Sequence, residues 1–578
     1  MVSTLGFSYA TERLVGLALG GSEKQKKFSD QYADHYRKVP TLTVTKALRK
    51  RSTAELMVEG RDLPWLLSQW RQRQPDKVFL IWSSADSEDQ QWTYKQFDDA
   101  VRRVAAGLAA QGLQQGQRLL IHMENSPEFL LTYFACAYLG LVSVITNTRS
   151  VARELVQNIQ LTDVVAVVTQ THLLPVITEA DASLPLVIVT EGAIEEGGNI
   201  SSYTLEPDSS QQKRLTFNTL LDHPPVSTQR CPDPHSDLRV QFTSGTTSEP
   251  KAVLSTHANA LFAAQQTALG YGLTADDVCQ VFVPLFHTNG LSTLVTSTLW
   301  VGGTVLLQRK FSASHFWEPA IKYKASWSCL PGAFFTQALK KYSVPDHDFR
   351  FWITACTPDI ADHYGVATRN HWGMTEMITL PIMDDPHHPS PGASIGRPTP
   401  GIDVAIRRDD GSDCDPGETG ALWVRGIQGI TIFKDYLNNQ EAMLSSFNAN
   451  GWFITGDRVS IDTQGYLFFE DRQKDLLRVG GENVAASEIE AVIHQSGWVE
   501  ECAVVGQKHT MLEEVPVAFV KPTDNAPTNL CEKLINHCKQ HLADFKVIRD
   551  VYIVDDFPRA TLQKIAKYKL RERLPVIE

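Results

Sequence analysis

Hydrophobic positions along the chain follow two alternating patterns, one with helical spacing and one of short continuous runs. Phe97, Val101, Val104 and Leu108 recur at helical spacing, which predicts an amphipathic helix that Gly112 ends. Short continuous apolar runs predict buried strands between such helices, at residues 77–82, 118–123, 141–147, 164–170 and 184–190. Helices that alternate with short buried strands favour an α/β fold, in which helices cover the faces of parallel sheets.

Some parts of the chain depart from this alternation. Residues 1–60 lean toward helix with little strand pattern, so we interpret them as a partly ordered N-terminal extension, with a docking helix as the alternative. Residues 191–236 are polar and rich in Ser, Pro and Gly, which predicts a surface excursion and not a core element. Residues 400–470 become rich in strands, and the last hundred residues predict a small α+β unit.

Composition narrows the classes of protein. The chain has 578 residues, of which 43% are hydrophobic and 21% charged, so a large core is available. Its net charge of −12 argues against nucleic-acid binding. Nine scattered cysteines, none in a CxxC pair, fit neither a disulfide framework nor a zinc site and suggest a reducing compartment. We expect no membrane span and no secretory signal, because no apolar run reaches about 18 residues and the N-terminus has no basic region.

A hydroxyl-rich loop follows a predicted strand at residues 241–251, QFTSGTTSEPK. Gly245 lets backbone N–H groups face inward together, and Lys251 adds a positive charge. Five hydroxyl donors surround this glycine: Thr243, Ser244, Thr246, Thr247 and Ser248. A polyphosphate requires many donors at close range, so the loop predicts a phosphate site. The Gly and Lys spacing differs from that of the GxxxxGK[ST] loop, and a solvated Ser/Thr turn is the alternative.

A second motif, NHWGMTE, spans residues 370–376. It offers an aromatic surface for stacking (Trp372), a hydroxyl (Thr375) and a carboxylate (Glu376). Since Mg²⁺ prefers oxygen ligands and takes one or two protein carboxylates beside phosphate oxygens, Glu376 is a candidate magnesium ligand. The alternative is the start of a helix.

Two later segments complete the set. Asp457 follows a glycine turn in GWFITGD and can accept hydrogen bonds from a sugar diol, while Gly480 and Gly481 allow a ligand to approach the backbone closely. Near the C-terminus, PRATLQK ends at Lys564, close to two lysines that we interpret as solvated, Lys567 and Lys569.

In order and spacing, these segments resemble the core motifs of the adenylate-forming superfamily, which contains acyl-CoA synthetases, luciferases and nonribosomal adenylation domains. The resemblance covers about residues 61–578, and SASHFW, TIFKDY and FTSGTTSEPK resemble the carnitine–CoA ligase branch. It implies a large N-terminal domain of layered sheets and helices (residues 61–473) and a small mobile α+β C-terminal domain (residues 475–578).

The resemblance also implies a reaction. ATP and a carboxylic acid give acyl-AMP and pyrophosphate, and the CoA thiol then displaces AMP. The implied small molecules are ATP, Mg²⁺, CoA and a carboxylic acid, without nucleic acid, and the expected location is cytoplasmic, in fatty-acid metabolism. The acid and the oligomeric state stay open.

Site residues follow from the same resemblance. Thr375 would contact the α-phosphate, Glu376 would hold Mg²⁺, and Trp372 stands where a Tyr usually stacks on adenine. The phosphates would be held by Thr243, Ser244, Gly245, Thr246, Thr247 and Lys251. The rest of the nucleotide would contact Cys356, Thr357, Pro358, Asn370, His371, Gly373, Met374, Asp457 and Arg472.

Lys564 matches the adenylation lysine, a cation that offsets repulsion between the carboxylate and the α-phosphate. The C-terminal domain would then rotate about Lys474, withdraw Lys564 and bring Gly480 and Gly481 toward the CoA pantetheine. His287, in PLFHTN, matches the acyl-pocket motif, and a satisfied core histidine is the alternative.

Several positions depart from the family pattern, and other interpretations follow. Gln563 replaces a glycine before Lys564, Asp471 replaces a glycine before Arg472, and residues 351–370 are short. Because of these departures, an alternative hypothesis is that the chain is a degenerate homologue that binds nucleotide without turnover. A ligase that stops at acyl-AMP or loads a carrier protein is a further alternative. A hydrolase elbow at Ser394 (GASIG) is disfavoured, because a proline-rich loop precedes it where a buried strand is needed.

Overall fold

The computed structural model describes residues 53–85, 88–181, 183–190, 212–227, 231–243, 250–331, 333–354, 358–385, 390–392, 394–408, 410–472, 476–558, 565 and 567–577. Contacts divide the chain into two units, Met1–Met57 and Val58–Glu578. The predictions for the N-terminal extension fall mostly outside the described residues, where only helix α4 (Thr53–Val58) begins. All elements after α4 belong to the second unit.

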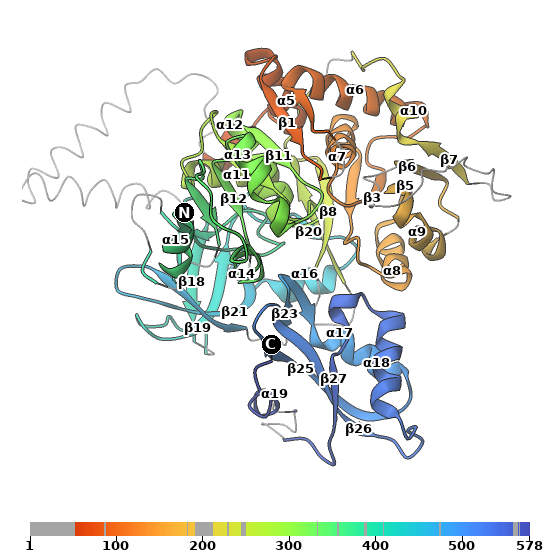
Figure 1. Ribbon diagram of the computed structural model, residues 1–578, viewed down its shortest axis with the longest axis vertical. Helices are drawn as coiled ribbons and strands as arrows, with labels where there is room; N and C mark the ends of the chain where they lie inside the picture. The colour runs from red at the N-terminus through yellow and green to blue at the C-terminus, as the bar shows by residue number, and fades with distance from the viewer. Residues whose placement is uncertain are drawn as a thin grey trace, which may run out of the picture. The chain divides into compact units, whose positions relative to one another are not determined.

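Two largely parallel sheets form the centre of this unit (Figure 1). The first runs in the order β20 (Asp435–Tyr436), β9 (Lys251–Thr256), β8 (Asp237–Thr243), β4 (Val142–Ile145), β3 (Arg118–His122), β5 (Val164–Gln170), β6 (Leu186–Thr190) and β7 (Lys213–Thr216). The second runs in the order β14 (Ala367–Arg369), β13 (Phe351–Ile353), β12 (Trp327–Cys329), β10 (Val278–Val281), β11 (Thr304–Leu307), β1 (Val78–Trp82) and β2 (Gln90–Thr93).

Helices connect and cover these strands, as parallel pairing requires. They are α5 (Leu63–Arg73), α6 (Tyr94–Ala110), α7 (Pro127–Leu139), α8 (Ala152–Thr162), α9 (Leu174–Ala180), α10 (Phe217–Leu221), α11 (His257–Gly270), α12 (Ser297–Val301), α13 (Trp317–Lys322), α14 (Ala333–Leu339) and α15 (Pro358–Tyr364). Short 3₁₀ turns lie at η1 (Thr171–Leu173) and η3 (Ala313–His315), and η2 (Asn289–Thr296) is a π-helix. None of the helices in the described part of the chain is long and apolar enough to cross a membrane.

Helix α7 shows how local sequence sets these elements. The Ser126 side chain accepts a hydrogen bond from the backbone N–H of Phe129, Pro127 occupies the first turn, and Gly140 ends the helix in the left-handed conformation at φ +73°. Nearly every side chain of α7 is buried, because the helix packs between α6 and the strands β3 and β4 (Figure 1).

The third sheet is antiparallel and holds the strand-rich region predicted near residues 400–470. Its order is β15 (His371–Trp372), β16 (Ile382–Met383), β17 (Ser394–Pro398), β22 (Leu467–Arg472), β21 (Phe453–Ile461), β19 (Gly420–Arg425) and β18 (Asp403–Arg407). Helix α16 (Gln440–Ser446) precedes β21. Ser394 is buried in β17 and its hydroxyl donates to the carbonyl of Leu467 at 2.9 Å, so it serves the sheet, as expected for an accidental match to the hydrolase motif.

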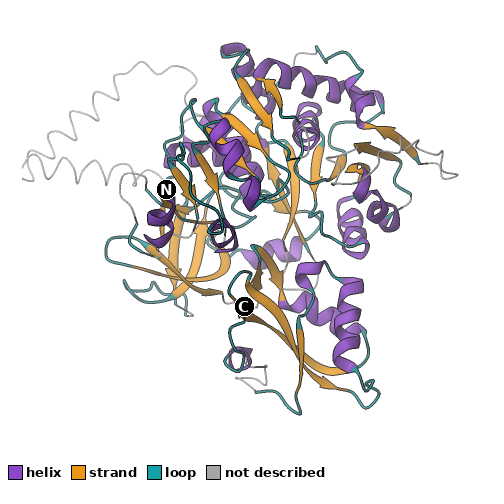
Figure 2. Ribbon diagram, viewed as in Figure 1, coloured by secondary structure: helices purple, strands orange, loops and turns teal. Residues whose placement is uncertain are grey.

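A small α+β lobe, here called the C-terminal lobe, follows from Leu476. Its sheet contains β24 (Glu482–Ala485), β23 (Leu476–Val479), β26 (Glu513–Pro522), β25 (Val499–His509) and β27 (Asp550–Ile553). Alternate residues of β25 enter two cores: Cys502 and Val504 face α17 (Ala486–Gln495) and α18 (Leu530–His541), whereas Ala503 and Val505 pack with Leu570 of α19 (Lys567–Arg571). The 3₁₀ turn η4 (Asp544–Lys546) precedes β27, and Figure 2 shows these strands with their helices.

The prediction of a surface excursion at residues 191–236 was wrong for residues 213–221. Within the segment that we expected to be a surface excursion, Lys213–Thr216 pairs in parallel with β6 as an edge strand, and Phe217–Leu221 forms α10. Phe217 and Leu220 are buried, and Leu220 lies against Gly107 of α6, where a β-carbon would meet its backbone at 2.6 Å. A four-residue edge strand with polar side chains and two apolar residues three apart is too short to produce a clear periodic signal.

The short stretch between residues 351 and 370 still contains a helix between two parallel strands. Strands β13 and β14 are parallel neighbours, with Phe351 opposite Ala367, and the seven-residue helix α15 connects them. The shortening therefore leaves a helix of about two turns on this side of the sheet.

Candidate active site

The predicted phosphate loop is the connection of a β-hairpin. Strands β8 and β9 are antiparallel, and Thr243 at the end of β8 lies opposite Lys251 at the start of β9. The loop residues Ser244, Gly245, Thr246 and Thr247 lie outside the described residues. The hairpin therefore fixes both ends of the loop, and it places the Lys251 side chain where the loop returns to the sheet.

Lys251 and Glu376 are brought together by a residue that the sequence analysis did not single out. The Lys251 Nζ lies 4.8 Å from the ring centroid of Tyr436, and the Tyr436 hydroxyl donates to Glu376 Oε1 at 2.7 Å. Tyr436 reaches this position because β20 pairs with β9, with Tyr436 opposite Val253. Burial, the charge of Glu376 and the hydrogen bond to it raise the pKa of Tyr436 well above its ordinary value, so Tyr436 stays a neutral donor.

A tight turn presents Glu376. The Met374 carbonyl accepts from the N–H of Met377 at 3.0 Å, and the Glu376 carbonyl accepts from the N–H of Phe433 at 2.8 Å. Glu376 is only 5% exposed, while Thr375 in the same turn is partly exposed. Ile378, immediately after the turn, has φ +62°, a conformation that β-branched residues rarely adopt and that concentrates at functional sites.

The carboxylate, hydroxyl and ammonium of this cluster suit Mg²⁺ bound together with phosphate. Glu376 supplies one buried carboxylate, and Mg²⁺ in phosphate-transfer sites takes one or two carboxylates and completes its octahedron with phosphate oxygens and water. The donor set therefore fits the predicted ion.

Two residues predicted to bind the nucleoside contact each other. The indole Nε1–H of Trp372 donates to Asp457 Oδ2 at 2.8 Å, and both residues are buried. Asp457 lies opposite Arg472 in the ladder between β21 and β22. Three positions predicted to bind the nucleoside are thus neighbours on the third sheet: Trp372, Asp457 and Arg472.

The residues before Trp372 have structural partners. Asn370 donates from Nδ2 to the Ser394 carbonyl at 3.0 Å and accepts from the N–H of His371 at 2.9 Å. Burial and the nearby charge of Arg478 lower the pKa of His371 to about 4, so His371 is neutral near pH 7. Gly373 lies in the loop that follows β15 and is exposed.

His287 lies in a loop that several buried polar groups hold. Gln241 of β8 donates from Nε2 to the Phe286 carbonyl at 2.7 Å, and Asn125 accepts at Oδ1 from the N–H of Leu285 at 2.7 Å. The π-helix η2 begins two residues after His287, and a β-carbon on Gly290 would meet the Pro284 carbonyl oxygen at 2.4 Å. π-helical turns are rare and frequent at functional sites, and this one fixes the exit of the loop.

The C-terminal lobe reaches this loop through residues 480–483, GGEN, which contain the predicted glycine pair. Gly480 and Gly481 turn the chain from β23 to β24 at φ +57° and +88°, and Gly481 lies beside the Pro331 carbonyl. The next residue, Glu482, accepts at Oε1 from Asn147 Nδ2 at 3.3 Å and lies 3.1 Å from His287 Nε2. The sequence analysis named the two glycines but did not identify Glu482 as the partner of His287.

The opposite charges of His287 and Glu482 shift the pKa of each residue. Burial alone lowers the pKa of His287, but the charge of Glu482 and its hydrogen bond outweigh burial and raise it. Burial raises the pKa of Glu482, but His287, Arg149 and the hydrogen bond from Asn147 outweigh burial and lower it. The His287 side chain is 38% exposed and paired with Glu482, so it is not buried in the core, while its place near the acyl group stays a prediction.

Other predicted site residues cannot be placed. Pro358 begins α15, and its side chain is not described. Cys356, Thr357, Lys474 and Lys564 lie outside the described residues, so their roles stay predictions. Lys567, interpreted as solvated, instead pairs with Glu490 of α17 at 2.7 Å.

Comparison with known proteins identifies the family. The sequence model of AMP-binding enzymes matches residues 67–437, and that of the AMP-binding enzyme C-terminal domain matches residues 488–564. The crotonobetaine/carnitine–CoA ligase of Escherichia coli O139:H28 (strain E24377A / ETEC) is 31% identical over 508 residues, which cover 86% of this chain and 96% of that enzyme.

Two solved structures of o-succinylbenzoate–CoA synthetase from Bacillus subtilis share the fold at 25% identity and cover 88% of this chain. A double mutant bound with the product analogue OSB-NCoA gives a TM-score of 0.74 and is covered to 98%. The complex with ATP and magnesium gives a TM-score of 0.61 and is covered to 99%.

Fold, site and relatives together define an adenylate-forming ligase. The chain belongs to the family of AMP-binding enzymes, and its relatives include acid–CoA ligases. The predicted superfamily with its carnitine–CoA ligase branch, the α/β fold with a separate C-terminal domain and the class of AMP-forming acid–CoA ligases are confirmed.

Proposed function

We propose that this chain converts a carboxylic acid to its CoA thioester, with ATP as the activating substrate and acyl-AMP as the intermediate. The observation that carries the proposal is the contact chain from Lys251 through Tyr436 to Glu376, which joins the phosphate hairpin to the candidate magnesium carboxylate. An ATP-dependent ligase requires these two groups at the same triphosphate.

In the first half-reaction, a carboxylate oxygen of the acid attacks the α-phosphorus of ATP and pyrophosphate leaves. Lys251 and the hairpin loop would hold the departing phosphates, and Lys564 would lie between the two anions that must approach each other. Mg²⁺ bound by Glu376 would neutralise charge on the phosphates. Tyr436 keeps the Glu376 carboxylate oriented by its hydrogen bond.

In the second half-reaction, the CoA sulfur attacks the acyl carbon and the thiol proton passes to water. The bond between the acyl carbon and the phosphate oxygen of AMP breaks, and AMP leaves with that oxygen. Gly480 and Gly481 would let the pantetheine pass close to the backbone. Glu482 lies 3.1 Å from His287 Nε2, so this nitrogen is engaged by the carboxylate and would not act as a free base. This pairing would leave room for the thiol beside the loop.

The identity of the acid should be tested first among the acids that appear in the names of the relatives. We propose a panel that contains carnitine, crotonobetaine, o-succinylbenzoate and straight-chain fatty acids, assayed by pyrophosphate release with and without CoA. The proposal requires release that depends on one of these acids and a thioester product that depends on CoA. ATP binding without release by any acid would contradict it and favour the non-catalytic homologue, and transfer only to a carrier protein would favour the alternative acceptor. A cytoplasmic location is also proposed, on the scattered cysteines.

A separate test addresses the proposed role of Lys564, which is limited to the first half-reaction. Lys564→Ala should abolish acid-dependent pyrophosphate release, yet chemically prepared acyl-AMP should still be converted to acyl-CoA. If adenylation survives the change, the role of Lys564 is wrong, while the ligase activity itself is not affected by that result.

A further inference from the structure

A buried lysine joins the C-terminal lobe to the rest of the protein. Lys546 Nζ lies 2.6 Å from Glu154 Oε1 and 2.7 Å from Glu488 Oε1. Glu154 belongs to α8, whereas Glu488 of α17 and Lys546 of η4 both belong to the C-terminal lobe. All three side chains are at least four-fifths buried, so solvent screens their attraction only weakly.

The two bonds of Lys546 differ in what they connect. The bond to Glu488 lies within one lobe, so it does not depend on where that lobe sits. The bond to Glu154 crosses between lobes, so it depends on the arrangement of the two lobes. Because attraction between buried charges falls off once water enters between them, the Glu154 bond stabilises this arrangement selectively.

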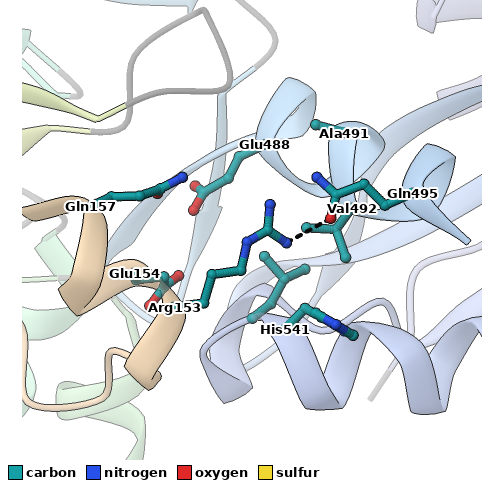
Figure 3. Close-up of a pocket in the computed structure, with 9 residues that line it drawn as sticks. Arg153, Glu154, Gln157, Glu488, Ala491, Val492, Gln495 and His541 are labelled. Atoms are coloured by element: carbon teal, nitrogen blue, oxygen red, sulfur yellow. Dashed lines mark hydrogen bonds between the residues drawn. The ribbon is translucent and has the colours of Figure 1, made fainter. Parts of the chain in front are cut away.

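Residues close to Glu154 in the sequence also contact the C-terminal lobe. Arg149 pairs with Asp544 at 2.7 Å and its guanidinium lies 4.5 Å from the ring centroid of Phe545. Arg153 donates to Gln495 Oε1 at 2.8 Å across a cavity of about 210 Å³, which Glu154 and Glu488 also line (Figure 3). Residues 147–154 therefore form part of the surface that contacts the C-terminal lobe.

The docked arrangement is the one that presents the GGEN segment to the site. Asn147 is the first of residues 147–154 and donates to Glu482, the partner of His287. The chain agrees better with the product-analogue structure of o-succinylbenzoate–CoA synthetase, at a TM-score of 0.74, than with its ATP–magnesium complex, at 0.61.

We propose that Glu154 and Lys546 are positioning residues of the CoA-dependent half-reaction: their bond holds the C-terminal lobe where Gly480, Gly481 and Glu482 meet the His287 loop. The inference rests on the proposed ligase function. Neither residue touches a substrate in this scheme, and both act through the placement of the lobe.

Glu488 provides a matched control in the same cluster. Two carboxylates share one ammonium, so Glu488 competes with Glu154 for Lys546 and repels it. Burial raises the pKa of Glu488, Lys546 opposes this, and the charge of Glu154 adds to the rise. Glu488→Gln removes the competitor and keeps the bond between lobes, whereas Glu154→Gln removes that bond. The amide oxygen that Glu154→Gln introduces can still accept from the N–H of Val151, as Glu154 Oε2 does at 3.1 Å, so the start of α8 keeps its cap.

The test separates the half-reactions in the full chain. Glu154→Gln should lower the single-turnover rate from acyl-AMP and CoA to thioester about tenfold, the size of a typical coupling between buried partners, and change acid-dependent pyrophosphate exchange less than twofold. Glu488→Gln should not slow the CoA step, and Lys546→Arg should retain more of it than Lys546→Met. Equal loss in both half-reactions, or an unchanged CoA step in Glu154→Gln, would overturn the proposal.

A second readout does not depend on activity. In an Arg153→Cys/Gln495→Cys background, a short bifunctional thiol reagent should link the two lobes, and adding Glu154→Gln should reduce the yield severalfold while Glu488→Gln does not. Equal yields in all backgrounds, or no linkage in any, would refute the positioning role. If the wild-type chain releases no pyrophosphate with any acid, the ligase function fails, and the linkage yields still decide whether the bond places the lobe.

Discussion

The indole of Trp372 and the carboxylate of Asp457 are joined by a 2.8 Å hydrogen bond, although 85 positions separate them in the chain. One residue was predicted to stack on adenine and the other to bind the ribose. Their contact means that the two residues predicted for the two halves of a nucleoside site hold each other in place within the third sheet.

We expect Trp372→Phe to destabilise the protein. The ring surface is largely kept, but a buried carboxylate loses its charged hydrogen bond, which contributes about 1.5–3 kcal/mol. Urea unfolding should show the free energy of unfolding reduced by that amount. Trp423→Phe, on β19 of the same sheet, is the control and should cost less. Equal losses would mean that ring volume, and not the bond to Asp457, decides stability here.

Tyr436→Phe should slow adenylation. It removes the hydroxyl that donates to Glu376 at 2.7 Å, so acid-dependent pyrophosphate exchange should fall about tenfold or more, in line with the net value of a charged hydrogen bond. Glu376→Gln should fall further and need more Mg²⁺ for half-maximal rate. Tyr94→Phe, which removes a buried hydroxyl bonded to the Gly303 carbonyl at 2.7 Å, is the matched control and should keep normal exchange. An unchanged Mg²⁺ requirement in Glu376→Gln would argue against magnesium at this carboxylate.

The His287–Glu482 pair should give the CoA step an alkaline limit. The raised pKa of His287 means that its contribution is present at low pH and is lost as pH rises through that pKa. The lowered pKa of Glu482 means that its contribution is present above the ordinary carboxyl pKa and is lost as pH falls through the lowered value. The pair is therefore charged between the two pKa values, with Arg149 also facing Glu482.

A pH profile of thioester formation from acyl-AMP checks this. Glu482→Gln should move the alkaline limb to lower pH, because the charge that raises the pKa of His287 is gone. His287→Gln should remove that limb. A limb that stays unchanged in His287→Gln would assign the titration to another group, such as the CoA thiol.

Gly290→Ala should disturb the His287 loop. A β-carbon there would lie 2.4 Å from the Pro284 carbonyl oxygen, a backbone atom, so the loop or the π-helix must shift at a cost of about 1–3 kcal/mol. Thermal unfolding should show the loss, and KM for the acid should rise. Gly373→Ala is the comparison, since its β-carbon would lie 3.3 Å from the Leu380 side-chain tip and 3.5 Å from the Thr379 carbonyl oxygen, which is ordinary contact. A smaller loss in Gly290→Ala than in Gly373→Ala would contradict the packing argument.

Much of the fold could be predicted from local pattern. The helical spacing from Phe97 to Leu108 became α6, and the apolar run at residues 164–170 became β5. Pattern failed at Phe217 and Leu220, where an edge strand and a one-turn helix carry too few residues to show a period.

The site was predictable where a motif is contiguous and not where it is assembled across the chain. Thr243, Lys251 and Glu376 came from runs of neighbouring residues. Tyr436 and Glu482 acquired roles only through contacts across 60 and 195 positions, which strand pairing and lobe docking create. TIFKDY and GGEN were noticed as family-like strings, but the partner of each side chain depends on register that no local signal records.

Ile378 carries a consequence for anyone who tries to make this protein more heat-resistant. Its left-handed backbone, two positions from Glu376, costs about 1–2 kcal/mol that Gly would release. The Ile378 side chain is only 2% exposed, however, and removing a buried aliphatic side chain costs about 2–5 kcal/mol. Selection for thermal tolerance should therefore retain the isoleucine, and the strained turn that carries the Glu376 carboxylate should survive in the hardier variants. Enrichment of Gly at this position in a heat-survival screen would contradict this.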